Sequence, residues 1–279
     1  MNALELKHVY KQYGDFSIRD LNLTLPQGGI MGLVGENGAG KSTTIRMILN
    51  MVKPDSGEIA VLGKTAGDDF NAVKEDIGVV LDEPAFTNCL NARHVNKIMG
   101  MMFRNWDARS FRDYLDRFSL PEKKQVKEYS RGMKMKLSIA VALSHHPKLL
   151  LLDEATSGLD PVVRDDILDI FFEFTRDETH SILMSSHIVS DLEKVCDYVA
   201  FLHGGSLVEC AEKDVLLEKY GLVHGTREQL AEFGALLRGK RETPYGMEGV
   251  VERAGIPAGT PVQAIGLEEL FVYLTKEGH

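Results

Sequence analysis

Apolar and polar side chains alternate between residues 4 and 25. Leu4, Leu6 and Val9 share one face of the first stretch, and a similar alternation returns from Phe16 to Leu23. An alternation of this kind places one face of a strand in a core and leaves the other face in solvent. The pattern therefore predicts two or three antiparallel strands at the start of the chain.

An apolar run follows at residues 30–34 and is closed by Gly35. A short apolar run bounded by glycine indicates a buried strand. Behind it, apolar residues recur with the spacing of one helical face, at Ile45, Ile48, Leu49 and Val52. Residues 29–49 therefore read as a strand, a glycine-rich loop and a helix, and the rest of the chain is organised around them.

The loop in this segment fits the phosphate-binding pattern G-x-x-x-x-G-K-[ST]. Its glycines leave backbone N–H groups free to converge on phosphate oxygens, and the positive end of the next helix adds to that field. Lys41 supplies a charge for the β and γ phosphates, and the Ser42 hydroxyl is suited to Mg²⁺. The strand-to-helix context disfavours the alternative, a glycine-rich turn with a surface lysine. The predicted nucleotide-binding residues of the loop are Gly35, Asn37, Gly38, Ala39, Gly40, Lys41, Ser42 and Thr43.

The middle of the chain predicts a strand at 58–62, a short helix at 71–76 and a central strand at 77–81 that ends at Asp82-Glu83. The pattern then becomes helical at 91–104, 107–119 and 133–144, which predicts a helical insertion over about 84–146. The residues expected on the apolar faces of its first two helices are Ile98, Met101, Met102, Phe111, Tyr114, Leu115 and Phe118.

A run of leucines at 149–152 ends in two carboxylates, Asp153 and Glu154. A fully buried parallel strand has this composition, and the carboxyl ends of such strands border the ligand crevice of open α/β sheets. Asp153 is predicted to lie near the Mg²⁺ held by Ser42, and Glu154 to orient the water that attacks the γ phosphate. The alternative is that the two acids cap the next helix.

The segment after these acids predicts a turn at 157–160, a helix at about 161–176 begun by Pro161, and a strand at 181–185. That strand delivers His187, whose imidazole can reach the γ phosphate or the attacking water. Strands near 198–203 and 206–210 close the main domain, 1–211.

The remaining residues, 212–279, predict a small C-terminal accessory unit. We expect two helices within 212–237, short extended pieces within 240–266, and an amphipathic helix at 267–276. The overall prediction is an α/β fold, a P-loop NTPase core with an antiparallel β subdomain, a helical insertion and this small α+β extension.

The composition narrows the classes of protein that fit. A net charge of −9 argues against general nucleic-acid binding, and three scattered cysteines are too few for a disulfide framework. The chain shows neither a signal peptide nor an apolar run of membrane-spanning length. A reduced, cytosolic setting is expected, so any membrane passage must belong to another polypeptide.

Together these motifs resemble the ATP-binding cassette family over residues 3 to about 210, most closely the ATPase subunits of bacterial multidrug or peptide-antibiotic exporters. The resemblance makes 35–43 the Walker A loop and Asp153 and Glu154 the Walker B pair. It makes 157–160 the D-loop, and His187 the switch histidine. It also implies that Tyr13 stacks on adenine and that Ser130 and Gly132 belong to the signature.

The resemblance implies cofactors and partners as well: ATP, Mg²⁺, a second ATPase subunit of the same or a related chain, and an integral-membrane permease. Each ATP would lie between Walker A of one cassette and the signature of the other. The permease would dock near the helical insertion and the loop 82–90, where Phe86 is a candidate contact. The chain would then be peripheral on the inner face of the membrane.

Two motifs depart from the family pattern. Asp82 stands where a Mg²⁺-sensing glutamine is usual, and a carboxylate can still bind the metal. In the signature, Tyr129, Arg131 and Met133 replace leucine, the first glycine and glutamine. Arg131 could face a γ phosphate or point to solvent, and the sequence leaves both open.

Two other functions are alternatives to a transporter subunit. A soluble cassette ATPase acting on DNA or ribosomes usually carries paired cassettes, coiled coils, zinc modules or basic extensions, and the sequence shows none. A nucleotide-binding regulator without hydrolysis is disfavoured by Glu154 and His187.

Overall fold

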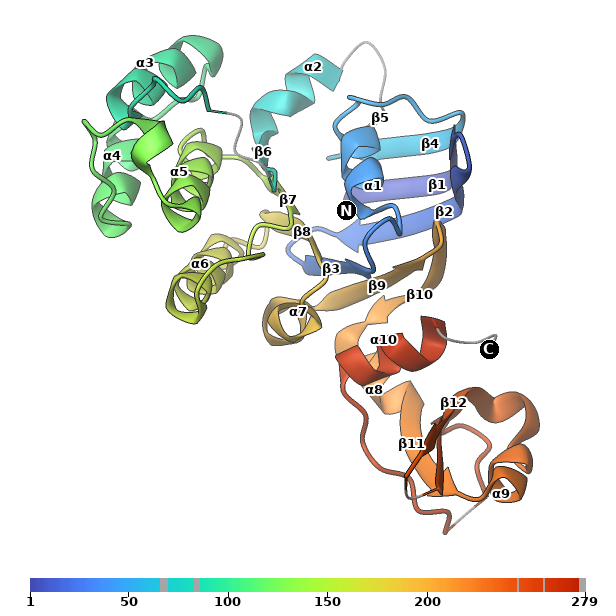
Figure 1. Ribbon diagram of the computed structural model, residues 1–279. Helices are drawn as coiled ribbons and strands as arrows, with labels where there is room; N and C mark the ends of the chain where they lie inside the picture. The colour runs from blue at the N-terminus through green and yellow to red at the C-terminus, as the bar shows by residue number, and fades with distance from the viewer. Residues whose placement is uncertain (66–69, 83–85, 245, 258, 276–279) are drawn as a thin grey trace.

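The computed structural model describes residues 1–65, 70–82, 86–244, 246–257 and 259–275. Within these ranges a ten-stranded mixed sheet runs in the order β5-β4-β1-β2-β10-β9-β3-β8-β7-β6 (Figure 1). Its strands are β1 (Asn2–Tyr13), β2 (Phe16–Pro26), β3 (Ile30–Gly35), β4 (Ser56–Val61), β5 (Lys64–Thr65), β6 (Ile77–Val80), β7 (Leu149–Asp153), β8 (Ser181–Ser186), β9 (Tyr198–His203) and β10 (Ser206–Glu212).

The first two strands form the predicted antiparallel pair, with Tyr13 opposite Phe16 at the hairpin tip. Leu4, Leu6 and Val9 are buried, so the alternation along β1 places its apolar face in the core as predicted. The hairpin tip therefore has a fixed register and lies beside the phosphate loop.

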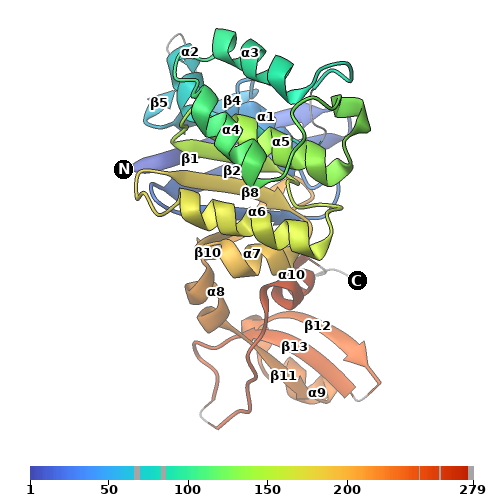
Figure 2. The same cartoon turned by 90° about the vertical axis from the view of Figure 1, so that its left-hand side faces the viewer.

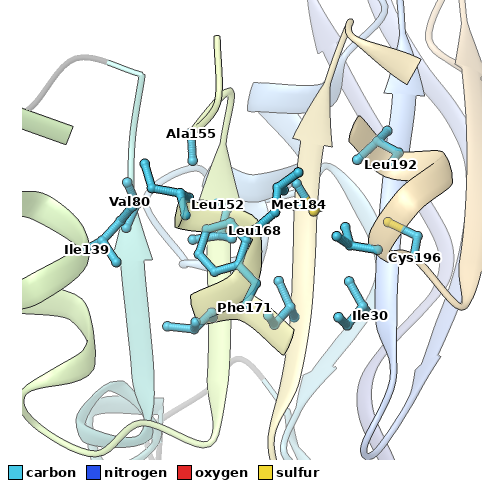
Figure 3. Packing of buried hydrophobic residues seen from close by; sticks show 14 of the residues in the cluster. Ile30, Val80, Ile139, Leu152, Ala155, Leu168, Phe171, Met184, Leu192 and Cys196 are labelled. Atoms are coloured by element: carbon cyan, nitrogen blue, oxygen red, sulfur yellow. The ribbon is translucent and has the colours of Figure 1, made fainter. Parts of the chain in front are cut away.

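The other half of the sheet is parallel, and every residue of β3, β7 and β8 is buried. Successive side chains enter two cores on opposite faces of the sheet; Leu152 belongs to one core and Leu151 to the other. Figure 3 shows the first core, in which Leu152 and Met184 pack with Phe171 of α6 (Pro161–Phe174). Helices cover both faces, which explains the unbroken apolar runs of these strands.

One strand lies elsewhere than predicted. The run at 77–80 forms β6, which is an edge strand and not a central one. An apolar composition indicates only that a segment is buried. Helix α5 (Arg131–Leu143) covers β6, so this strand is buried without a second neighbouring strand. A Cβ at Gly78 would approach the carbonyl oxygen of Ala142 in α5 to 2.8 Å.

The phosphate-loop helix α1 (Lys41–Ile48) is shorter than the apolar spacing predicted. Asn50 has a left-handed φ of 53°, which no helix continues through. Val52 lies beyond the helix, although it still packs against the core.

The helical segment has its predicted order. It contains α3 (Ala92–Met102), α4 (Ala108–Arg117), η2 (Val126–Glu128) and α5, whereas α2 (Phe70–Val73) and η1 (Lys74–Asp76) precede β6 at the place of the predicted short helix. Phe111 and Leu115 are buried as predicted, but Met101 and Met102 are 72% and 64% exposed. The buried residues of α3 are Ala92 and Val95. The prediction that Met101 and Met102 are core residues was therefore wrong.

After β10 the chain builds a second, three-stranded antiparallel sheet in the order β11-β13-β12 (Figure 2). Its strand β11 lies between the two helices predicted for 212–237 and was not predicted. Helix α10 packs against α7 (Val189–Val195), and the ring of Phe271 in α10 lies 5.3 Å from the ring of Phe201 in β9. The remaining elements are α8 (Lys213–Lys219), β11 (Tyr220–Gly225), α9 (Arg227–Ala231), η3 (Gly234–Leu236), β12 (Leu237–Thr243), β13 (Gly246–Glu252) and α10 (Leu267–Thr275).

Within the described ranges, none of the helices combines the length and the apolar character that a membrane span requires.

Candidate nucleotide-binding site

The glycine-rich loop joins β3 to α1 and turns twice through left-handed backbone, at Gly38 with φ 84° and at Gly40 with φ 110°. At Gly35 the constraint is space, because an added Cβ would lie 2.7 Å from the carbonyl oxygen of Leu202. Glycine is therefore required at these positions. The loop delivers the chain into the first turn of α1, where backbone N–H groups have no intrahelical partner and are available to an anion.

Lys41, the first residue of α1, is buried inside this loop. Its Nζ donates to the carbonyl oxygens of Gly35, at 2.6 Å, and Glu36, at 3.2 Å. The same Nζ lies 3.4 Å from Oε1 of Glu154. The loop is thus folded around its own lysine, whose charge is held at the place where the predicted phosphates would lie.

Asp153 closes β7 and joins three elements. Its Oδ1 accepts hydrogen bonds from Ser42 Oγ of α1 at 3.1 Å and from Ser185 Oγ of β8 at 2.6 Å. A carboxylate beside a hydroxyl is an oxygen donor set of the kind that Mg²⁺ takes, with further positions left for phosphate oxygens and water. The described residues fit that metal.

Glu154 has a left-handed φ of 51°, unusual for a residue with a side chain. The backbone holds this conformation, since Glu154 N donates to Ser185 O at 3.1 Å. Its Oε2 lies 2.7 Å from His187 Nδ1.

The neighbouring helix α6 is capped by Asp160, which accepts from Val163 N. The alternative that the two acids cap that helix was therefore wrong.

Tyr13 lies at the tip of the β1–β2 hairpin and is 44% exposed to solvent. Its cross-strand partner Phe16 contacts the phosphate loop, because a Cβ at Gly40 would lie 3.2 Å from Phe16 Cζ. The hairpin therefore holds an exposed aromatic ring beside the loop that would bind phosphate.

A second group of predicted residues lies at the start of α5. Ser130 caps this helix by accepting from Met133 N at 3.2 Å, and Gly132 lies in its first turn. Arg131 Nη2 donates to Asp82 Oδ1 at 2.8 Å, a partner that neither of the two directions considered for Arg131 included. Residue 83 of the Asp82-Glu83 pair lies outside the described residues.

The structure thus divides the predicted residues into two groups. Lys41, Ser42, Asp153, Glu154 and His187 form one connected set of contacts. For Ser130, Gly132 and Asp82, the contacts given above lie at the start of α5 and not within that set.

Sequence reasoning missed Ser185. Its hydroxyl donates to Asp153 and also accepts from Glu154 N at 3.2 Å, so it fixes both acids. A signal was present, because Ser185 and Ser186 are polar residues closing a buried strand. Buried hydroxyls need a partner, and the nearest strand end supplies the acids.

Comparison with known proteins shows which family has a sequence of this kind. The pattern of the ABC transporter family matches residues 18–157. The bacitracin transport ATP-binding protein BcrA of Bacillus licheniformis is 38% identical over 206 residues, which cover 71% of this chain and 66% of that protein. The Nod factor export ATP-binding protein I of Rhizobium etli is 37% identical over 231 residues, covering 79% of this chain and 72% of that protein.

A solved structure agrees with these relatives. The structure of an ATP binding subunit of an ABC transporter superposes with a TM-score of 0.70 at 27% identity, covering 77% of this chain and 91% of that one. The family match covers the phosphate loop and both acids, and the relatives and the solved structure belong to the same family. The chain therefore belongs to the ABC transporter family, as one of its ATP-binding subunits.

Proposed function

We propose that this chain hydrolyses ATP to power export through a separate membrane permease. The observation that carries the proposal is the contact between Ser42 and Asp153, flanked by Lys41 and by the Glu154–His187 pair. The two relatives described above are ATP-binding proteins of bacitracin transport and of Nod factor export. They support a transporter of the peptide-antibiotic or multidrug type.

The residues of the loop and the end of β7 would bind different parts of Mg·ATP. Backbone N–H groups from Gly35 to Thr43 bind the phosphates, and Lys41 exchanges its carbonyl partners for the β and γ phosphates. Ser42 and Asp153 would hold Mg²⁺, which would neutralise charge on the transferred phosphoryl group. These two side chains are already 3.1 Å apart, so they need little rearrangement to bind one metal ion.

Hydrolysis needs a water molecule aligned with the γ phosphate. The Glu154 carboxylate accepts the proton of that water, and the hydrogen bond of 2.7 Å to His187 fixes the direction of the carboxylate. The left-handed backbone at Glu154 places its side chain next to the phosphate loop. Purified chain releasing phosphate from ATP is the first test of the proposal.

We expect Tyr13→Ala to weaken ATP binding about fivefold, since base stacking on an aromatic ring is worth ~1 kcal/mol. Titration calorimetry with ATP measures the effect, and Tyr13→Phe should retain the wild-type affinity. Tyr10→Ala is the matched control, because Tyr10 lies on the same strand and is 41% exposed. Equal affinities in the Tyr13→Ala and Tyr10→Ala variants would leave Tyr13 with a structural role only.

A second ATPase subunit completes the proposed site. Ser130 is exposed and lies at the start of α5, apart from the contact set of Lys41 and Asp153. An ATP bound by Lys41 of one chain would be approached by Ser130 and Gly132 of the other. The second subunit is another copy of this chain or a related one.

The permease is proposed to dock beside the edge strand β6. Two adjoining cavities, of about 280 and 430 Å³, share the lining residues Ile77, Val79, Leu81, Met102 and Phe103. Phe86 lines the smaller cavity, although residues 83–85 of the loop 82–90 lie outside the described residues. Burial lowers the pKa of His145, which also lines it, so this wall is uncharged at neutral pH. Apolar walls and flexible methionines suit a short apolar segment of a partner.

Met102→Asp is expected to detach the permease, since it places a charge in the shared wall of both cavities. Tagged chain is recovered from detergent-extracted membranes of the encoding organism, and its membrane partner is identified by mass spectrometry. Val215→Asp changes an exposed valine of α8 and should keep the partner. Equal retention by both variants would place the docking surface elsewhere.

The same recovery decides between the proposed function and a soluble cassette acting on nucleic acid. A polytopic membrane protein supports the transporter and a location on the cytoplasmic face of the membrane. Ribosomes or DNA in its place would support the alternative, which the net charge of −9 disfavours. Residues 212–279 are proposed to be the small accessory unit, because they carry the three-stranded sheet and the returning helix α10.

A further inference from the structure

Arg164 of α6 and Asp191 of α7 form an ion pair inside the molecule. Nη1 of the arginine lies 3.5 Å from Oδ1 of the aspartate, whose side chain is only 3% exposed. The two helices pack against each other, and Leu168 and Leu192 belong to the same core (Figure 3). The pair therefore joins two helices, each of which begins soon after a segment of the candidate site.

The guanidinium of Arg164 also reaches the turn in front of its own helix. Its Nη2 donates to the carbonyl oxygen of Leu159 at 3.3 Å. In the same turn, Ser157 N donates to the carbonyl oxygen of Glu154 at 3.0 Å. One side of the ion pair is thus connected through this turn to the backbone of Glu154.

Asp191 is connected to the side-chain partner of Glu154. Its backbone N–H donates at 3.2 Å to the carbonyl oxygen of Ile188, the residue after His187. The His187 ring in turn has its Nδ1 at 2.7 Å from Oε2 of Glu154. The contacts therefore form a closed ring, which contains both the ion pair and the Glu154–His187 contact.

The ion pair is poorly suited to stabilising the fold. Arg164 Nε and Asp191 Oδ2 are buried, and neither atom has a hydrogen-bond partner among the described residues. Buried polar atoms without a partner destabilise a folded protein, and a buried ion pair often contributes no more than an apolar pair of similar volume. A role beyond stability is therefore expected for these two side chains.

We infer that Arg164 is a positioning residue for ATP hydrolysis. Because it holds the carbonyl of Leu159 and the carboxylate of Asp191 at once, it keeps the turn before α6 and the segment of His187 in a fixed relation. That relation keeps the imidazole within hydrogen-bond distance of Glu154, so the carboxylate stays directed at the attacking water. The inference rests on the proposed function, in which Glu154 is the general base.

Arg164→Lys tests this bridge without leaving the buried carboxylate unpaired. Lysine keeps a charge beside Asp191, but it lacks the planar fork that reaches two partners at once. We expect kcat for ATP hydrolysis to fall about five- to tenfold, as for the loss of one hydrogen bond. The KM for ATP should stay within about twofold, because no phosphate-binding residue is changed. Equal kcat in Arg164→Lys and wild type would overturn the inference.

A double variant separates positioning from folding. Arg164→Met with Asp191→Leu removes both charges and leaves neither unpaired, so a cooperative thermal transition near that of wild type is expected. Its kcat should still fall at least as far as in Arg164→Lys, because the link between the two segments is gone. A folded double variant with wild-type kcat would show that the pair is structural only, and would refute the inference.

Lys194 and Asp165 provide the matched control. They form another ion pair between α7 and α6, at 3.6 Å, but their side chains are 62% and 71% exposed. Exposed pairs contribute little, so Lys194→Met with Asp165→Asn should leave kcat within about twofold of wild type. A fall as large as that in Arg164→Lys would overturn the specific role of Arg164.

Hydrogen exchange on the nucleotide-free chain tests the bridge apart from ATP hydrolysis. In Arg164→Lys, the backbone N–H groups at 157–160 and 188–192 should exchange faster, by up to about tenfold, while those of β12 should not change. Equal exchange in wild type and variant would overturn the inference. A wild-type chain that hydrolyses no ATP would refute the proposed function instead, and the exchange rates would still decide whether Arg164 holds the two segments.

Discussion

Glu154→Gln is expected to abolish ATP hydrolysis while ATP still binds. The amide keeps the size and shape of the side chain, but it cannot accept a proton from the attacking water. A general base contributes about 10²- to 10⁴-fold to the rate, and a loss of at least the lower value is expected. Lys41 keeps its hydrogen bonds to Gly35 and Glu36, so the loop should remain folded.

Two measurements separate chemistry from binding in this variant. Phosphate release gives the rate, and titration calorimetry gives the ATP affinity, which should equal or exceed that of wild type because a negative charge near the phosphates has been removed. Glu178→Gln, an exposed residue of the loop between α6 and β8, is the control and should hydrolyse ATP normally. A Glu154→Gln rate within about tenfold of wild type would exclude Glu154 as the base.

Lys41→Ala is expected to weaken ATP binding by roughly ten- to a hundredfold. Hydrogen bonds to charged groups are worth about 1.5–3 kcal/mol each, and the variant loses the buried charge that faces the β and γ phosphates. Binding of ATP and of AMP is measured side by side. The loss should be confined to ATP, because AMP lacks the phosphates that Lys41 contacts.

Folding must be checked in this variant, since Lys41 is buried and lies 3.4 Å from Glu154. A cooperative thermal transition shows that the chain has folded, and unchanged AMP binding shows that the rest of the site is intact. Lys53→Ala removes an exposed lysine soon after α1 and should bind ATP as wild type does. If Lys41→Ala binds ATP with wild-type affinity, the phosphate site has been misplaced.

The local elements of the site could be predicted because their signals are local. Glycines at fixed spacing before Lys41 require one loop geometry, and Pro161 at the start of a helix is favoured by its own backbone. Unbroken apolar runs likewise identified β3 and β7, since strands buried on both faces have no polar side to show. These inferences need only neighbouring residues.

The wrong or missing predictions concern neighbours in space. The apolar composition at 77–80 indicated a buried strand. Whether a second strand or a helix covers it depends on where α5 packs. Met101 and Met102 looked like core residues, and they instead lie on the exposed side of the last turn of α3. Strand β11 became visible only through its pairing with β13.

The sequence by itself determined that this chain has a strand, a phosphate loop and a helix, followed by a buried strand ending in two acids. Spacing along the chain is enough for that, because each element is specified within a few residues. Only the tertiary structure decided that Ser185 fixes both acids and that Arg131 faces Asp82 and Gly158. The physical reason is that hydrogen bonds and ion pairs form over a few ångströms between residues that are tens of positions apart, and the packing of the sheet and its helices sets those distances.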